Sequence, residues 1–104
     1  MIVHATYDSY DDLIQHGFSI VDFYTITCGP CKLFSRILED IESELPFLQI
    51  VKVNLTDYPK LGARLDIEAV PTIFFIKDGT LLERSEGVID EAEVKAKISQ
   101  YYYG

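Results

Sequence analysis

The sequence predicts an α/β fold with a central mixed sheet of four to five strands and helices on both faces. Two observations indicate this class: strand-like and helix-like runs alternate through most of the chain, and a strand hairpin followed by a helix ends it. The chain has 104 residues, of which 48% are hydrophobic and 25% charged, which is typical of one globular domain. We therefore expect residues 1–104 to form a single domain.

The N-terminal segment predicts a short strand, a helix and a central strand. Ile2 to Ala5 is strand-like, and Asp8 to His16 is expected to be a helix that Gly17 ends in the left-handed conformation. The β-branched and aromatic run from Phe18 to Ile26 predicts a strand buried on both faces. Asp22 is the only charged residue in that run, so its carboxyl group needs a specific explanation.

The next segment completes a β-α-β unit. Apolar residues recur at intervals of three and four from Cys31 to Leu45, which predicts an amphipathic helix that Pro46 ends. Apolar residues dominate the alternating run from Leu48 to Leu55, which predicts a mostly buried strand. Thr56 to Leu65 is expected to form a short helix, because Pro59 lies in its first turn, where proline is tolerated.

The C-terminal segment predicts an antiparallel hairpin and a final helix. Thr72 to Lys77 and Thr80 to Glu86 are strand-like and are separated by Asp78-Gly79, a strong two-residue turn signal. Asp90 is positioned to cap the final helix, with Glu93 three residues later in a capping-box pattern.

The charge of the chain excludes several classes of partner. The net charge is −8, and nucleic-acid binding depends on lysine and arginine replacing the counterions of phosphates. The first residues lack the basic segment of a secretory signal, and no apolar run reaches the ~18 residues of a membrane span. We expect a cytoplasmic monomer that binds neither nucleic acid nor membranes.

The chemistry is expected at Cys28-Gly29-Pro30-Cys31, between a buried strand and a long helix. In the reducing cytosol a close cysteine pair is more often catalytic or metal-binding than structural. Unpaired N–H groups and the dipole at the helix N-terminus stabilise a thiolate at Cys28, so this sulfur is the expected nucleophile. Cys31, one turn later, is expected to be buried and to act as the resolving thiol. Pro30 suits the first turn, and Gly29 leaves room for the backbone of a partner.

Other functions of the cysteine pair are weaker alternatives. A zinc site needs two further ligands, and the only histidines, His4 and His16, do not form a recognisable ligand pair. No histidine lies near Cys28 in the sequence, which gives a Cys-His protease little support. A zinc site shared between two chains and a binding module that does not use its thiols both stay open, and we assign no metal ligand.

A set of motifs stands in order between Phe18 and Gly87. The set comprises Val21-Asp22-Phe23-Tyr24, Cys28-Gly29-Pro30-Cys31, Ala69-Val70-Pro71-Thr72, Lys77-Asp78-Gly79 and Gly87. Together these motifs resemble the thioredoxin family. The resemblance implies a thioredoxin fold and a thiol–disulfide oxidoreductase that reduces disulfides in partner proteins through a mixed disulfide. It also implies that the chain binds no cofactor and receives electrons from NADPH through a flavin-containing thioredoxin reductase.

The same resemblance assigns roles around the cysteines. Asp22 matches the buried carboxylate that takes the proton of the resolving Cys31, and burial in an apolar strand is expected to raise its pKa. Lys52 matches the lysine near that carboxylate. Pro71 is expected to be a cis proline facing the cysteines, with the Val70 backbone free to pair with an extended substrate segment.

Two departures from the family pattern concern the substrate-binding surface. The family usually has tryptophan immediately before the first cysteine, whereas this chain has Thr27 and no tryptophan at all. Asp66 stands where many relatives have glycine, and Glu68 adds negative charge beside the docking edge. These differences predict a specialised set of partners. The residues expected to contact substrate are Thr27, Gly29, Pro30, Val70, Pro71 and Gly87.

Overall fold

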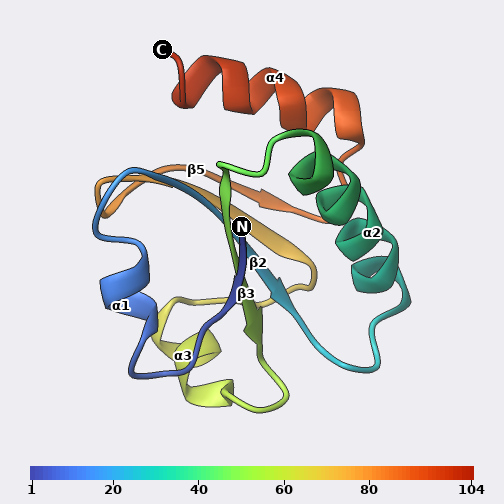
Figure 1. Ribbon diagram of the computed structural model, residues 1–104. Helices are drawn as coiled ribbons and strands as arrows, with labels where there is room; N and C mark the ends of the chain where they lie inside the picture. The colour runs from blue at the N-terminus through green and yellow to red at the C-terminus, as the bar shows by residue number, and fades with distance from the viewer.

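The computed structural model describes residues 1–104 and has a five-stranded sheet between two layers of helices (Figure 1). The strands are β1 (Ile2–His4), β2 (Phe18–Tyr24), β3 (Gln49–Asn54), β4 (Thr72–Lys77) and β5 (Thr80–Glu86). The helices are α1 (Tyr10–Leu13), α2 (Gly29–Glu44), α3 (Pro59–Arg64) and α4 (Glu91–Tyr101). The predicted α/β class is confirmed.

The sheet is mixed and has β2 at its centre. The strand order is β1-β3-β2-β4-β5, with β1, β3 and β2 parallel to one another and with β4 antiparallel to both β2 and β5. Every residue of β2 except Tyr24 is buried, because helices cover both faces of the sheet at this strand. The run of β-branched and aromatic residues therefore predicted the central strand, but the strand ends at Tyr24 and the expected last residue, Ile26, is exposed.

Alternate side chains of β2 enter two separate cores. Phe18 and Ile20 pack in one core with residues of α2 and α4, and Val21 and Phe23 pack in the other with residues of α1 and α3. Figure 1 shows the same division, with α2 and α4 on one side of the sheet and α1 and α3 on the other. Because side chains alternate along a strand, Asp22 shares the face of Ile20 and lies on the α2 side.

Helix α1 is shorter than predicted. The backbone N–H of Thr6 donates to Ser9 Oγ at 2.8 Å, and the N–H of Ser9 donates to Thr6 Oγ1 at 3.1 Å, so a closed turn occupies the expected first residues of the helix. At its other end the carbonyl of Leu13 accepts a hydrogen bond from Gln49 Nε2 at 2.7 Å and none from the N–H of Gly17, which a longer helix would require. The prediction of a helix from residue 8 to residue 16 was therefore wrong at both ends.

Gly17 has the predicted positive φ but a different role. Its φ is +74°, and it follows Leu13, the last residue of α1, by four positions (17 minus 13). Its N–H donates to Asp78 Oδ1 at 2.7 Å, and its carbonyl accepts from the N–H of Asp78 at 2.9 Å. Gly17 thus joins the start of β2 to the β4–β5 turn and does not cap α1.

The β4–β5 hairpin has the predicted bounds. Asp78 and Gly79 both have positive φ, at 51° and 80°, as the two central residues of a type I′ turn require. A register shift between Phe75 and Ile76 places Phe75 opposite Glu83 and Ile76 opposite Leu81. This bulge leaves one residue of β5 without a partner and increases the local twist of the edge strand.

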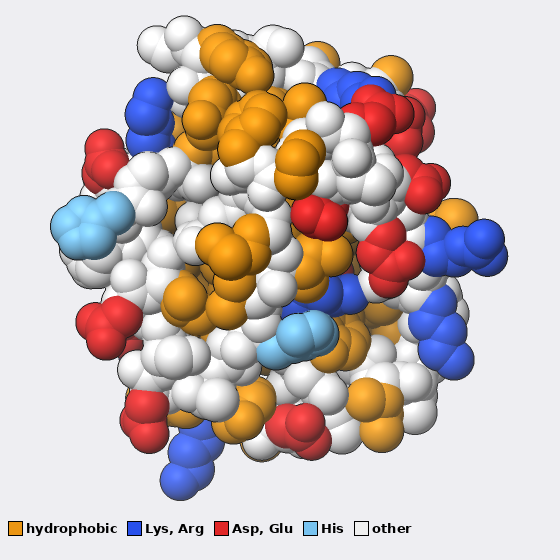
Figure 2. Space-filling view, in the orientation of Figure 1, with side chains coloured by type: hydrophobic (Ala, Val, Ile, Leu, Met, Phe, Trp, Pro, Cys, Tyr) orange, Lys and Arg blue, Asp and Glu red, His pale blue; other side chains and the backbone are white.

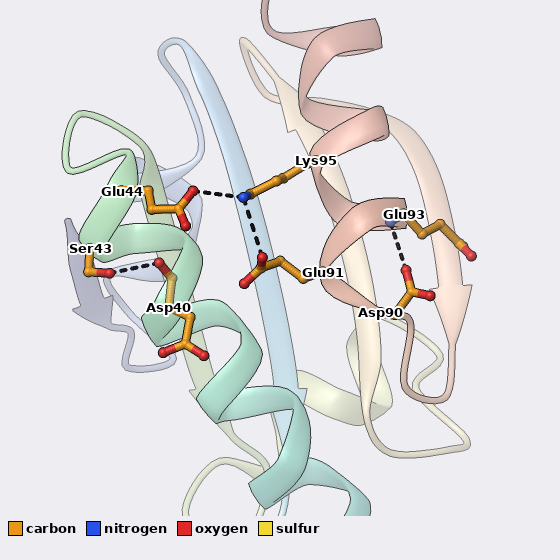
Figure 3. Close-up of polar contacts among 7 residues, drawn as sticks. All are labelled: Asp40, Ser43, Glu44, Asp90, Glu91, Glu93 and Lys95. Carbon is orange, nitrogen blue, oxygen red and sulfur yellow. Dashed lines mark hydrogen bonds and ion pairs between the residues drawn. The ribbon is translucent and has the colours of Figure 1, made fainter.

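Lys95 links the end of α2 to the start of α4 (Figure 3). Its Nζ lies 2.7 Å from Glu44 Oε2 and 3.3 Å from Glu91 Oε2. The last turn of α2 contains no basic residue, so Lys95 supplies positive charge at the negative end of the helix dipole. Asp90 caps α4 as predicted, because its Oδ1 accepts from the N–H of Glu93 at 2.8 Å. None of the helices is long and apolar enough to cross a bilayer.

Candidate active site

The cysteine pair lies where β2 leads into α2. Cys28 is the N-cap of α2, and its Sγ accepts a hydrogen bond from the N–H of Cys31 at 3.1 Å. The helix therefore begins at Gly29, two residues before the expected start at Cys31, with Pro30 in its first turn. Cys28 and Cys31 form a disulfide with their Cα atoms 5.3 Å apart.

The two sulfurs differ in accessibility. Cys31 is 3% exposed, whereas Cys28 is half-buried and its neighbours Thr27, Gly29 and Pro30 are exposed. An external disulfide can therefore approach Cys28 but not Cys31. The position of Cys28 at a helix N-terminus also favours an anion on this sulfur once the disulfide is reduced.

The loop before β4 faces Cys28. Cys28 Sγ lies 3.8 Å from the carbonyl oxygen of Val70, and the Val70–Pro71 peptide bond is cis, as predicted. The carbonyl of Pro71 accepts a hydrogen bond from the N–H of Gly87 at 2.8 Å. The structure therefore brings Val70, Pro71 and Gly87 to one side of the cysteine pair.

Asp22, on β2, is a buried acid without a hydrogen-bond donor. It is 0% exposed, and neither of its carboxylate oxygens has a hydrogen-bond partner. Lys52, its register neighbour on β3, places Nζ 3.8 Å from Asp22 Oδ2. Burial raises the pKa of Asp22 to about 6, and the charge of Lys52 opposes this rise only in part. Such a carboxyl group exchanges its proton near neutral pH.

Comparison with known proteins identifies the family. The family model described as Thioredoxin matches residues 1–100. The chain belongs to the thioredoxin family. A thioredoxin of Chlamydia muridarum is 33% identical over 101 residues, which cover 97% of this chain and 99% of that protein.

Two further proteins are similar to this chain. Thioredoxin Y2, chloroplastic, of Arabidopsis thaliana is 38% identical over 96 residues, which cover 89% of this chain and 58% of that protein. The crystal structure of Chlamydomonas reinhardtii thioredoxin f2 superposes with a TM-score of 0.86 at 28% identity, covering 97% of this chain and 96% of that one. These similarities agree with the thioredoxin fold implied by the motifs.

Family membership together with the cysteine pair establishes the type of reaction. This thioredoxin-family protein is a thiol–disulfide oxidoreductase and reduces disulfides in proteins. Its partners are accordingly disulfide-containing proteins and a reductase that returns it to the dithiol form. The dithiol form of the two cysteines carries the electrons that are transferred, and the disulfide in this structure is the oxidised form.

Ser35 and Tyr24 contact the lysine of this thioredoxin-family site, although the motifs did not indicate either residue. Lys52 Nζ donates a hydrogen bond to Ser35 Oγ and lies 5.0 Å from the centre of the Tyr24 ring. Ser35 follows Cys31 by four positions (35 minus 31) on α2, which places both on one face of the helix. That spacing was the only sequence signal for Ser35.

A shallow depression of about 230 Å³ connects these residues with Cys31. It is lined by Tyr24, Thr25, Ile26, Cys31, Lys32, Ser35 and Lys52. Lys52 lines the depression and also lies beside Asp22, so in this thioredoxin-family site it stands between the depression and the buried carboxyl group.

A second set of contacts missed by the motifs holds the loop before Cys28. The N–H of Ile26 donates to Thr56 Oγ1 at 3.2 Å, and the N–H of Thr56 donates to Asn54 Oδ1 at 2.9 Å. The carbonyl of Tyr24 accepts from the N–H of Leu55 at 2.8 Å. These bonds fix the loop that carries Thr27 against the end of β3.

No group of three or more histidine, cysteine, aspartate or glutamate side chains is positioned to hold an ion. His4, in β1, and His16, between α1 and β2, are both exposed.

Proposed function

We propose that Cys28 is the attacking sulfur and Cys31 the resolving sulfur of this protein-disulfide reductase. The observation that carries this assignment is the position of Cys28, which is accessible and caps α2, while Cys31 is buried one turn later. The N–H of Cys31 donates to Cys28 Sγ and stabilises negative charge there. This arrangement favours a thiolate at the sulfur that a substrate can reach.

The proposed reaction transfers two electrons in two displacements. The Cys28 thiolate attacks one sulfur of the substrate disulfide, and the other substrate sulfur leaves as a thiolate that takes up a proton. The Cys31 thiol then loses its proton and attacks Cys28 Sγ, which breaks the mixed disulfide and releases the second substrate thiol. The substrate gains two thiols, and the enzyme is left with the Cys28–Cys31 disulfide.

Asp22 is the proposed acceptor of the Cys31 proton, and Lys52 the proposed modulator of that carboxylate. The buried position of Asp22 on the α2 side of β2 and its raised pKa support this role. Lys52 and Cys31 line the same depression, which supports an exchange of protons with solvent from this side of the site.

The proposed substrate-binding surface surrounds Cys28. It consists of Thr27, Gly29, Pro30, Val70, Pro71 and Gly87. The distance of 3.8 Å between Cys28 Sγ and the Val70 carbonyl supports a path for an extended substrate segment along residues 70 and 71. Such a segment hydrogen-bonds to the protein backbone and thereby holds its own disulfide at Cys28.

We further propose that one domain of 104 residues acts as a monomer in the cytoplasm and binds no cofactor. The proposed electron donor is NADPH, acting through a flavin-containing thioredoxin reductase. The net charge of −8 supports the absence of nucleic-acid and membrane binding. On the face seen in Figure 2, lysine and arginine side chains are scattered among acidic and apolar ones and form no continuous basic patch.

Insulin-disulfide reduction tests the assignment of the nucleophile. With dithiothreitol as reductant, wild type is expected to precipitate insulin rapidly, whereas Cys28→Ser is expected to give the rate of dithiothreitol alone. Cys31→Ser is expected to form a mixed disulfide with insulin but to release it slowly. Equal insulin-reduction rates for wild type and Cys28→Ser would refute the assignment.

A further inference from the structure

The ammonium of Lys52 has two polar neighbours and a strong contact with only one of them. Lys52 Nζ donates a hydrogen bond to Ser35 Oγ on α2 but stays 3.8 Å from Asp22 Oδ2 on β2. The Lys52 side chain is 12% exposed and the Asp22 side chain 0% exposed, so water competes little for either group.

The separation of Lys52 and Asp22 is unusual for a buried pair of opposite charges. Charge-assisted N–H···O bonds are normally about 2.7–2.9 Å long, and a buried carboxylate gains most of its stabilisation from them. At 3.8 Å the ammonium donates no hydrogen bond to Asp22, and no other group of the protein donates one. Lys52 Nζ makes its hydrogen bond with Ser35 Oγ instead.

We propose that Ser35 is a positioning residue whose hydroxyl accepts the hydrogen bond of Lys52 and holds the ammonium short of hydrogen-bonding distance to Asp22. This proposal rests on the proposed function of Asp22 as the base for Cys31. With the ammonium held back, the Asp22 carboxylate stays poorly stabilised and takes a proton readily. Without Ser35, the ammonium moves to Asp22, and the carboxylate becomes a weaker base.

The surroundings of Asp22 contain few other groups that titrate. On β2 the nearest such group is Tyr24, whose pKa is raised by burial and by the charges of Asp22 and Asp57, so it is neutral at physiological pH. The register neighbour on β4 is Ile73, and α4 contributes the apolar Val94 and Ile98 to this core. On α2, Ser35 does not ionise, and the disulfide removes the proton of Cys31. In the oxidised protein the titration of Asp22 therefore reports the position of Lys52.

The test is an NMR titration of the Asp22 carboxyl carbon in the oxidised, full-length protein. Ser35→Ala is expected to lower the midpoint of the Asp22 titration by about one pH unit, which is about a tenfold loss of proton affinity. Ser35→Thr keeps the hydroxyl and is expected to keep the wild-type midpoint. The matched control is Ser43→Ala, the same change in the same helix, where Ser43 Oγ donates only to the Asp40 carbonyl (Figure 3). An unchanged or raised midpoint in Ser35→Ala would overturn the proposal.

A second titration asks whether Ser35 acts through Lys52. Lys52→Met removes the ammonium and is expected to raise the Asp22 midpoint. In that background Ser35→Ala is expected to change nothing further, because no ammonium is left to reposition. A shift of similar size in both backgrounds would show that Ser35 acts on Asp22 directly and would overturn the positioning role.

A kinetic measurement separates the positioning role of Ser35 from the proposed role of Asp22 as the base for Cys31. The rate at which Cys31 resolves a preformed mixed disulfide is measured against pH for wild type, Ser35→Ala and Asp22→Asn. The inflection of this pH–rate curve, which marks the titration of the base, is expected to move to lower pH in Ser35→Ala and to vanish in Asp22→Asn. If Asp22→Asn keeps the inflection, Asp22 is not the base, yet the NMR midpoint still decides the role of Ser35. If the inflection of the pH–rate curve vanishes in Asp22→Asn but stays at the wild-type pH in Ser35→Ala, Asp22 is the base, and only the proposed role of Ser35 is overturned.

Discussion

Asp22 and Lys52 are register neighbours on β2 and β3, yet their charged atoms stay 3.8 Å apart and no donor reaches either carboxylate oxygen of Asp22. An ionised carboxylate in this position loses its hydration without full compensation. The protein therefore holds a group at its centre that lowers its stability at neutral pH. Such a cost is typical of functional sites, where a perturbed pKa serves the reaction.

Asp22→Asn is expected to stabilise the oxidised protein at neutral pH. The pKa of Asp22 is raised from 3.8 to about 6 in the folded state, so the folded protein binds this proton more tightly than the unfolded chain does. The contribution of Asp22 to stability is therefore greatest below pH 4 and is lost as the pH rises to about 6. A difference of about two pH units sets an upper bound of about 3 kcal/mol for the gain at pH 7.

Urea unfolding at pH 7 and at pH 4 measures this gain. The stability difference between Asp22→Asn and wild type is expected to be large at pH 7 and to shrink towards zero at pH 4. Asp40→Asn, which changes an exposed aspartate of α2, is the control and is expected to stay within about 0.5 kcal/mol of wild type at both pH values. A less stable Asp22→Asn variant at pH 7 would contradict the prediction.

The two cysteines of the reduced protein are expected to differ in reactivity. Brief treatment with iodoacetamide at pH 7 is expected to modify Cys28 at least about ten times faster than Cys31, because Cys28 is accessible and caps α2 whereas Cys31 is 3% exposed. Peptide mapping by mass spectrometry measures both rates in one sample. Equal rates, or faster labelling of Cys31, would remove the physical basis for Cys28 as the nucleophile.

Trapping on a Cys31→Ser variant is expected to identify the partners. With the resolving thiol removed, Cys28 is expected to hold substrate proteins as mixed disulfides that dithiothreitol releases for mass spectrometry. The Cys28→Ser, Cys31→Ser double variant is the control for proteins that bind without exchange. Recovery of the same proteins with both variants would favour a binding module that does not use its thiols.

Local sequence patterns predicted the elements whose limits depend on local contacts. β4 and β5 have the predicted bounds, because alternation and the Asp78-Gly79 turn determine them within one hairpin. The end of α1 depends on Gln49, whose side chain binds the Leu13 carbonyl from 36 residues away in the sequence. No pattern within residues 8–16 contains that contact, so the helix was predicted too long.

In the active site, too, residues whose role depends on local sequence could be predicted, whereas those that depend on contacts between distant segments could not. Cys28 and Cys31 are recognisable because their chemistry depends on a short segment at a helix start. The contacts of Ser35 with Lys52 and of Thr56 with the loop before Cys28 join residues 17 and 30 positions apart. Serine and threonine are common polar residues, so apart from the spacing of Ser35 from Cys31 neither contact leaves a sequence signal.

Asp66→Gly is expected to stabilise the protein. Asp66 follows α3 with φ +57°, and the N–H of Ile67 donates to the Gly62 carbonyl at 2.9 Å, as in a Schellman motif. Glycine adopts this conformation without the Cβ penalty, so a gain of about 0.5–1 kcal/mol is expected in urea unfolding. The two hydrogen bonds from Arg84 go to the backbone carbonyls of Leu65 and Asp66 and are unaffected by the change.

Asp78→Gly is the matched comparison for that variant. Asp78 also has a positive φ, at 51°, but its Oδ1 accepts a hydrogen bond from the N–H of Gly17. Its replacement by glycine relieves the same strain and loses that bond, which contributes about 1 kcal/mol. We therefore expect no gain in stability from Asp78→Gly. Equal stabilisation by both changes would show that the bond to Gly17 contributes nothing.

Thr27→Trp is expected to improve reduction of protein disulfides without changing the chemistry of the cysteines. Thr27 is exposed beside Cys28, so an indole ring at this position adds apolar area to the docking surface. Burial of about 50 Å² of that ring against a partner gives about 1 kcal/mol, or about a fivefold rise in kcat/KM for insulin. A small neutral disulfide such as bis(2-hydroxyethyl) disulfide has no surface to bury against the ring, and its rate is expected to stay within about twofold of the wild-type rate.

Thr27→Val, which keeps the shape of the side chain, is the control and is expected to match wild type with both substrates. A fall in kcat/KM for insulin in Thr27→Trp would show that threonine here serves the partners of this protein better than an aromatic residue does.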